Sequence, residues 1–244
     1  MWSALIGLGA AALAGQGCEQ VGMDALAGVQ APAVIVLGER RGTEPDLYRA
    51  SRVVTALARR APVRLALEAV GVEQQGLLDA YGRREIEPED LAAELDWSSH
   101  WGYPYLPYAR LLAHARHGVE VVGIGQDLRA HSEPVPVPSG YAGVLRDAMA
   151  GHEAPPQVER DLLRYVAWRD NRLAVAALDG WDRQGFLVIV VDRVQVEGGK
   201  GVPWQVAKAG EVPVHAITLA WADAPCFEGD QVWRPWLLDP DRVR

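Results

Sequence analysis

The sequence is poor in several residue types on which common functional sites depend. Two cysteines, Cys18 and Cys226, are too few for a disulfide framework, a four-thiolate zinc site or an iron–sulfur cluster. No internal apolar run reaches the roughly 18 residues that a membrane-spanning helix requires. Cys-x-x-Cys-His, His-Glu-x-x-His and Gly-x-Ser-x-Gly are all absent, which excludes covalent c-type haem attachment and gives no support to a zincin or a serine hydrolase.

Positive charge is scarce as well. The 244 residues include 24 Lys+Arg against 32 Asp+Glu, which gives a net charge of −8. A protein that binds duplex nucleic acid neutralises phosphates with an excess of basic side chains, so we expect no nucleic-acid partner here. Apolar residues are abundant, at 49% of the chain, and this fraction excludes wholesale disorder and suffices for a large core.

The first 17 residues, MWSALIGLGAAALAGQG, carry no charged side chain and directly precede Cys18. Such a stretch is typical of a secretory signal, and the cysteine after it indicates a bacterial lipoprotein. We therefore predict a signal peptide over 1–17 and acylation of Cys18, which anchors the protein outside the cytoplasm on a membrane of the cell envelope, with the outer membrane favoured. Cys226 is then the only thiol of the folded domain. The alternative is a buried N-terminal helix.

Beyond this region, short apolar runs alternate with segments of helical periodicity. The runs predict strands at 33–37, 63–67, 119–124, 186–191 and 212–218, and the periodic segments predict helices at 46–60, 74–81, 88–95, 105–117 and 157–178. Strands that are apolar throughout and separated by helices indicate a single α/β domain, with a largely parallel central sheet and helices on both faces. We expect a linker over 18–32, the domain over 33–220, and an irregular, Trp- and Pro-rich tail over 221–244 that packs on the domain.

Polar residues follow the predicted strands at the carboxyl edge, where open parallel sheets bind ligands. We expect the following side chains to converge there: Glu39, Arg41, Glu68, Gln126, Asp127, Asp192 and Gln195. The alternative is that these are simply places where the chain meets water. That alternative is favoured for Asp127, Asp192 and Arg193, and it remains open for Glu39 and Glu68.

The order of the motifs resembles that of a known family. The segments of this chain that carry the resemblance are, in order, Gly38-Glu39-Arg40, Leu65-Ala66-Leu67-Glu68, Gln74-Gln75, Asp96-Trp97, Trp101-Gly102-Tyr103, Tyr108, Ala113, Arg116, Arg169-Asp170, FLVIVV and Gly201-Val202-Pro203. No single motif is specific, but the ordered set, over about 33–203, is similar to the ChaN-like haem-binding uptake lipoproteins of the Tiki/TraB/erythromycin-esterase-like superfamily. The resemblance implies an envelope α/β protein that binds haem and acts in iron acquisition. It also implies a polar ligand pocket, which here comprises Glu39, Arg41, Glu68, Arg169 and Gln195.

Two positions depart from the family pattern. The family has Gly-Glu-x-His after the first strand and Gly-x-Gly-His after the fourth, whereas this chain has Arg41 and Gln195 at the histidine positions. Arginine keeps its charge and cannot coordinate a metal, so beside Glu39 and Glu68 it would act as a fixed counter-ion. Glutamine is a weak neutral ligand and no general base. We therefore expect neither a superfamily-type metal centre nor hydrolysis that depends on one.

Haem binding requires an apolar slot, groups for the propionates and usually an axial ligand. Tyr108 and Tyr103 belong to the family pattern and are the candidate ligands, and the alternative is that both belong to an aromatic cluster in the core. His114 and His117 share a helix face, but their place in a last turn favours a structural role. His100, His131, His152 and His215 stand alone and carry little signal.

Three functions remain in competition. The first is a non-enzymatic carrier of haem or another flat apolar ligand, for which a homodimer is a possible assembly. The second is a divergent metal-dependent hydrolase that uses Glu39, Glu68 and Asp192. The third is a degenerate binding module that keeps the fold alone.

Overall fold

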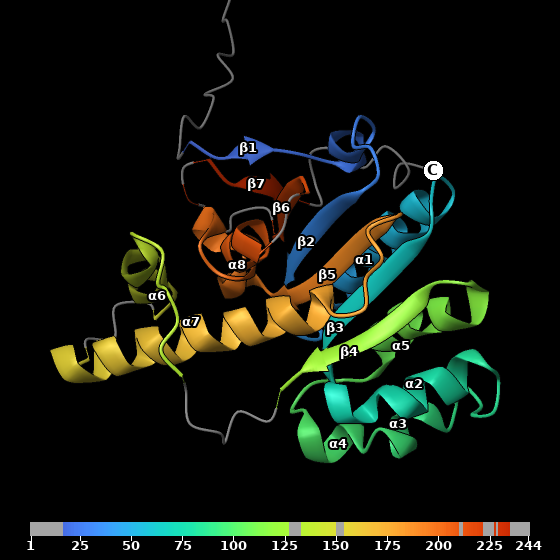
Figure 1. Ribbon diagram of the computed structural model, residues 1–244. Coiled ribbons are helices and arrows are strands. Elements are labelled where there is room, and N and C mark those ends of the chain that lie inside the picture. Colours follow the sequence, from blue (N-terminus) through green and yellow to red (C-terminus); the bar gives the residue numbers. More distant parts are fainter. Residues whose placement is uncertain are drawn as a thin grey trace, which may run out of the picture.

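A seven-stranded, entirely parallel sheet forms the centre of the protein (Figure 1). The computed structural model describes residues 17–126, 133–149, 154–209, 212–221, 227 and 229–234. The strand order is β1-β7-β6-β2-β5-β3-β4. The strands are β1 (Glu19–Gln20), β2 (Ala33–Glu39), β3 (Val63–Gly71), β4 (Glu120–Gly125), β5 (Phe186–Asp192), β6 (Val214–Leu219) and β7 (Gln231–Trp233).

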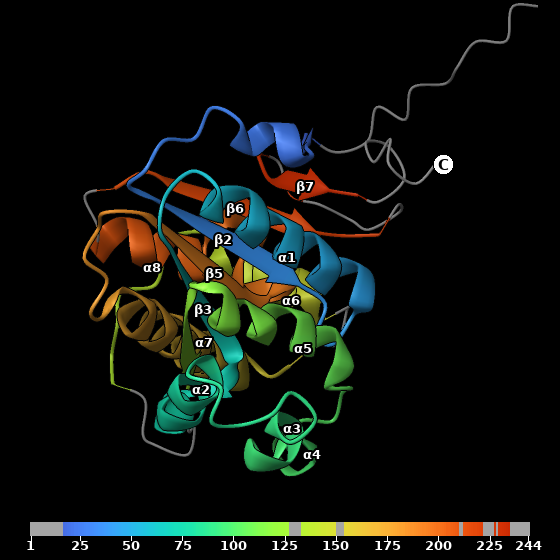
Figure 2. The same ribbon diagram turned by 90° about the vertical axis from the view of Figure 1, so that its right-hand side faces the viewer.

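Helices cover both faces of this sheet (Figure 2). The α-helices are α1 (Glu44–Ala58), α2 (Gln75–Gly82), α3 (Leu91–Glu94), α4 (Trp97–His100), α5 (Leu106–Leu112), α6 (Tyr141–Ala148), α7 (Pro156–Leu178) and α8 (Val202–Ala209). Short 3₁₀ helices are η1 (Met23–Leu26), η2 (Val72–Gln74), η3 (Ala113–His117), η4 (Arg193–Gln195) and η5 (Glu197–Gly199). None of the helices in the described part of the chain combines the length and apolarity needed to cross a membrane.

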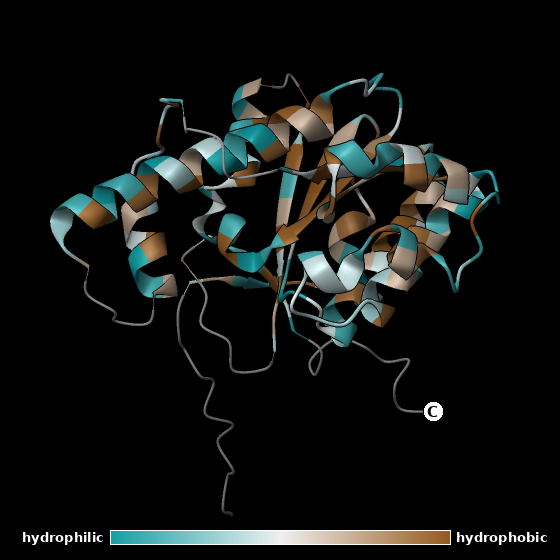
Figure 3. Ribbon diagram, turned by 90° about the horizontal axis from the view of Figure 1, so that it is seen from below, coloured by the Kyte–Doolittle hydropathy of each residue, from teal (hydrophilic) through white to brown (hydrophobic). Residues whose placement is uncertain are grey.

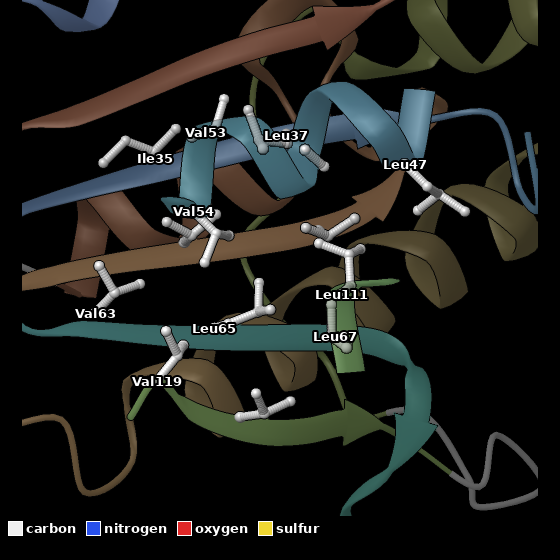
Figure 4. Close-up of a cluster of buried hydrophobic side chains, with 14 of the residues drawn as sticks. Ile35, Leu37, Leu47, Val53, Val54, Val63, Leu65, Leu67, Leu111 and Val119 are labelled. Atoms are coloured by element: carbon white, nitrogen blue, oxygen red, sulfur yellow. The ribbon is translucent and has the colours of Figure 1, made fainter. Parts of the chain in front are cut away.

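The alternation of side chains along each strand produces two separate cores. In β2, Ile35 and Leu37 face one side and pack with α1 and α5 (Figure 4), while Val34 and Val36 face the other side and pack with α7 and α8. Each such side chain contributes about 1.5–3 kcal/mol when it is fully buried, so neither face can be left open to water. The hydrophobic strands consequently lie inside, and the helices turn their hydrophilic sides outward (Figure 3).

These elements confirm the predicted fold class: a single α/β domain with a parallel sheet covered on both faces. Some segments differ from expectation. The range 18–32 does not stand free as a linker, because it contains β1 and η1 and buries Val21, Leu26 and Val29 in the core. The tail that begins at 221 is not irregular throughout, because β7 pairs with β6 within it. The rest of the tail and residues 1–16 lie outside the described residues.

Chain order places the carboxyl ends of β2, β5 and β3 next to one another. β5 is inserted between β2 and β3, although it follows both in sequence. The connection after β2 runs through α1 on one face, whereas the connection after β5 leads to α8 on the other. Connections that diverge in this way leave a crevice at the carboxyl edge of the sheet, which is where open α/β sheets bind ligands.

An irregularity in β3 lies beside this crevice. The pairing of β3 with β4 shifts register between Leu67 and Gly71, and Glu68 lies within the shifted stretch. Gly123 and Gly125 on β4 permit the close approach of the two strands. A Cβ at Gly125 would lie 2.6 Å from the carbonyl oxygen of Glu68, and one at Gly123 would lie 2.5 Å from that of Gly71. The Gly-x-Gly of β4 therefore serves strand packing, and it allows the bulge that presents Glu68.

We expect Gly125→Ala to destabilise the fold by about 1–3 kcal/mol, because the new methyl group meets backbone atoms that cannot move aside independently. Urea denaturation measures the change in the free energy of unfolding. Gly28→Ala is the matched control, because no atom lies within 4 Å of its added Cβ. Equal stability of the two variants would contradict the packing role assigned to Gly125.

Candidate functional site

Three acidic side chains lie near the carboxyl edge on three adjacent strands. Glu39 ends β2 and pairs in register with Asp192, which ends β5. Glu68 reaches them from the bulge of β3, and its Oε2 accepts a hydrogen bond of 3.0 Å from the backbone N–H of Asp192. These acidic groups lie close together although they are far apart in the sequence, so the site requires compensating positive charge.

Arg41 provides part of that charge. Its Nη2 lies 3.1 Å from Glu68 Oε1, and its Nε lies 2.7 Å from Asp192 Oδ2. Burial by itself would lower the pKa of Arg41, but the carboxylates of Glu68 and Asp192 raise it overall. From the sequence we expect Arg41 to act as the counter-ion of Glu39 and Glu68. The structure pairs it with Glu68 and Asp192 instead, so Asp192 takes part in the site although the sequence favoured a simple solvent-facing role.

Gln195 connects the carboxylates at the centre of the site. Its side chain is fully buried in η4. The Nε2 group donates hydrogen bonds to Glu68 Oε1 at 3.2 Å and to Asp170 Oδ1 at 3.4 Å, while Oε1 accepts one of 2.8 Å from the backbone N–H of Asp192. An amide can donate and accept at the same time, so Gln195 links groups that would otherwise repel.

A second arginine, Arg169, compensates the charge of the carboxylate that α7 contributes to the site. Arg169 pairs with its neighbour Asp170, whose Oδ1 lies 3.3 Å from Nη2. Tyr141 on α6 donates a hydrogen bond to the other carboxylate oxygen of Asp170. Burial raises the pKa of Asp170 to about 6, although Arg169 and Tyr141 act in the opposite direction. Neither Asp170 nor Tyr141 was predicted to belong to the site. The Arg169-Asp170 motif could have indicated a role for Asp170, whereas nothing in the sequence indicated one for Tyr141.

Glu39 has no arginine partner among the contacts described. Its Oε1 accepts a hydrogen bond from the hydroxyl of Tyr108, which itself accepts one of 3.2 Å from the backbone N–H of Gly42. Its Oε2 is buried without a hydrogen-bond partner among the described residues. Burial is the main cause that raises the pKa of Glu39 to about 8, and the charges of Asp192, Asp46 and Glu68 add to it. Glu39 is therefore largely protonated at neutral pH.

Tyr108 belongs to an aromatic cluster around Trp97. Only 2% of Tyr108 is exposed, and its ring centroid lies 5.0 Å from that of Trp97. Burial and the neighbouring Glu39 raise the pKa of its hydroxyl, which opposes formation of a tyrosinate. This arrangement fits the alternative of a packed core aromatic. Tyr103 lies nearer the surface and stacks on Trp101 with a centroid separation of 5.2 Å.

A pocket of about 770 Å³ opens beside these groups at the carboxyl edge. Its walls come from both sides of the sheet edge and comprise Arg41, Glu68, Gly71, Glu73, Gln74, His100, Trp101, Gly125, Gln126, Arg169 and Leu173. A neighbouring hollow of about 610 Å³ is lined by Tyr103 and Trp97 and shares Trp101 with the first. The lining of the pocket thus combines charged and polar groups with the Trp101 ring, and its volume is typical of sites for small molecules.

The structure therefore gathers the predicted pocket residues at one edge. The pocket is lined by Glu68, Arg41, Arg169 and Gln126. Gln195 and Glu39 are buried and do not line it, and Glu39 accepts a hydrogen bond from Tyr108. Asp127 lies outside the described residues. His114 is engaged elsewhere, because its Nε2 lies 2.9 Å from the hydroxyl of Ser51.

Metal coordination at this edge would depend on the donors present. Arg41 and Gln195 hold the two positions where the family pattern has histidines, and a guanidinium offers no lone pair to a cation. In the described part of the chain, no group of three or more His, Cys, Asp or Glu side chains is arranged to hold a metal ion. The observed contacts join the carboxylates to arginine, glutamine and tyrosine.

Comparison with known proteins shows a likeness to one family. The model of the family described as haem-binding uptake, Tiki superfamily, ChaN matches residues 25–133. Among solved structures, ChaN of Campylobacter jejuni, described with cofacially bound haem, has a TM-score of 0.63 and 16% identity over 82% of this chain and 86% of that chain. No curated protein matches the sequence.

Weaker structural matches include bacterial effector proteins. The type III effector HopBA1 has a TM-score of 0.48 and 12% identity over 82% of this chain and 86% of its own. A toxin effector domain of Vibrio vulnificus has a TM-score of 0.43 and 16% identity over 71% of this chain and 31% of its own. The match of the family model to residues 25–133 and the fold shared with ChaN together confirm the predicted resemblance to the ChaN-like family.

The raised pKa of Glu39 predicts a pH-dependent stability. The folded protein retains this proton up to a pKa of about 8, whereas the ordinary value is 4.5. The stability that the proton provides is complete below the ordinary pKa and is lost as the pH rises through the folded pKa. Glu39→Gln keeps the neutral form and an oxygen for Tyr108. We expect it to change the free energy of unfolding little at about pH 4 and to raise it by on the order of 2–4 kcal/mol at about pH 9.

Urea denaturation across the pH range measures this effect. Glu85→Gln is the matched control, because Glu85 is exposed and its hydrogen bond from Arg83 lowers its pKa. The control should show no gain at alkaline pH. A gain for Glu39→Gln that is the same at every pH would be inconsistent with titration of the buried carboxyl.

Proposed function

We propose that this protein is a non-enzymatic haem carrier of the bacterial cell envelope and that it acts in iron acquisition. The observation that carries the proposal is the pocket at the carboxyl edge, which combines an indole wall with two arginines in a chain of the ChaN-like family. A flat apolar ligand with anionic substituents requires these features together.

The residues present fit haem on physical grounds. Trp101 offers an aromatic ring to the porphyrin, and its location on the rim keeps that ring only partly covered by protein. The contacts described for Arg41 and Arg169 use the Nε and Nη2 groups, so neither Nη1 is engaged with a described carboxylate. A guanidinium has five N–H donors, and those that remain can bind propionate oxygens. The bound haem would supply the iron, while the protein supplies the slot and the charges.

Titration of the purified protein with hemin tests the proposal. We expect a saturable shift of the Soret band, and we expect Trp101→Ala to weaken binding about tenfold or more, since an aromatic anchor in a pocket commonly contributes 1–2 kcal/mol or more. Trp204→Ala is the matched control, because Trp204 lies on α8 and does not line the pocket. A folded protein without saturable hemin binding would leave the degenerate binding module as the better interpretation.

The envelope location includes a further proposal about Cys18. In the structure Cys18 is disulfide-bonded, and Cys226, the other cysteine of the sequence, lies outside the described residues. One sulfur atom cannot hold both a disulfide and a lipid, so the predicted anchor and the disulfide are exclusive. Both are compatible with a compartment outside the cytoplasm, because stable disulfides belong to oxidising compartments. We retain the lipid anchor as a proposal.

Cell fractionation with two variants distinguishes the two chemistries. If Cys18 is acylated, we expect Cys18→Ser to release the protein from membranes completely, while Cys226→Ser leaves it membrane-bound. Mass spectrometry of the wild-type protein checks for the attached lipid. A wild-type protein that fractionates as soluble, with its mass matching an unlipidated chain, would contradict the anchor.

A further inference from the structure

His100 lines the same pocket as the two arginines, although no motif in the sequence pointed to it. It is the last residue of α4, and 51% of its side chain is exposed at the mouth of the pocket. Among the histidines in the described ranges, only His100 contributes to the lining of this pocket. Within the described ranges, it is therefore the imidazole that a ligand in the pocket can meet.

The ring of His100 is held through one of its two nitrogens. Its Nδ1 lies 2.9 Å from the carbonyl oxygen of Asp96, and a carbonyl can only accept, so Nδ1 carries the proton. The Asp96 carboxylate lies 4.0 Å from the same nitrogen and is itself held by the hydroxyl of Ser99 at 2.6 Å. Nε2 has no hydrogen-bond partner among the described residues, and in this tautomer it carries the free lone pair. Histidines that bind metals commonly show this arrangement, in which the second nitrogen donates to a carbonyl or carboxylate.

The other candidate ligands near the pocket are less suitable. The hydroxyl of Tyr108 is buried and engaged with Glu39 and Gly42. Tyr103 does not line the main pocket, and burial raises the pKa of its hydroxyl, which disfavours a tyrosinate. His100 is adjacent in sequence to Trp101, the ring over which the guanidinium of Arg41 lies at 5.9 Å. Trp101, the two arginines and His100 thus line the same pocket.

We propose that Nε2 of His100 is the axial ligand of the haem iron. The inference rests on the proposed haem-carrier function and goes beyond it, because it names the atom that coordinates the iron. Binding of the porphyrin ring and ligation of the metal are separable, so they can be tested apart.

Parallel titrations with hemin and with metal-free protoporphyrin IX distinguish ligation of the iron from binding of the porphyrin ring. We expect His100→Ala to weaken hemin binding about tenfold or more and to shift the Soret and visible bands, as loss of an axial ligand requires. Protoporphyrin has no iron to ligate, so its affinity should be unchanged. Added imidazole should restore the wild-type hemin spectrum in His100→Ala. His117→Ala is the matched control, because His117 is exposed and does not line the pocket.

Other results would overturn the assignment. If His100→Ala leaves the hemin spectrum and affinity as in the wild type, His100 is not the ligand, and the carrier function stands. If Tyr103→Phe or Tyr108→Phe shifts the Soret band instead, a tyrosine holds the iron. If His100→Ala weakens hemin and protoporphyrin equally, the histidine only packs against the ring. If the wild-type protein binds neither porphyrin, the carrier function fails and the axial role fails with it.

Discussion

The site depends on compensation of carboxylates that the parallel sheet brings together and partly removes from water. Glu68 and Asp192 share Arg41, and Asp170 is paired with Arg169 and hydrogen-bonded by Tyr141. Burying an ionised carboxylate without a partner is costly, so these pairs are a condition of folding as well as a feature of the pocket. Glu39 needs no such partner, because burial raises its pKa and its side chain remains protonated, and therefore uncharged, near neutral pH.

This compensation limits the chemistry that the carboxyl edge of the sheet can support. Arg41 and Gln195 stand at the positions where the family pattern has histidines, and both are engaged with the same carboxylates. Groups that could bind a cation are thereby used in ion pairs and hydrogen bonds within the protein. A ligand then meets the outer part of the site, where Trp101 and His100 form the pocket wall. The proposed carrier function rests on the shape and charge of this pocket, and the proposed His100 ligand adds coordination of the haem iron.

Much of the fold could be predicted because the central strands are apolar throughout. Apolar runs such as FLVIVV indicate burial on both faces, and the polar residues after them indicate the carboxyl edge. The helices α6 and α8 and the strands β1 and β7 were not predicted. β1 and β7 span two and three residues, respectively, and they form through pairing with each other and with β6. Segments of that length carry too little periodicity to be recognised alone.

The sequence by itself determined the parallel α/β architecture, the family resemblance and the expectation that Arg41 and Gln195 stand in place of two imidazoles. Those conclusions follow from local composition and motif order, which need no knowledge of distances. Only the tertiary structure decided which carboxylate Arg41 pairs with, that Tyr108 is buried against Glu39, and that His100 lines the pocket. Such contacts join residues far apart in the chain, and they depend on a strand order in which β5 enters between β2 and β3.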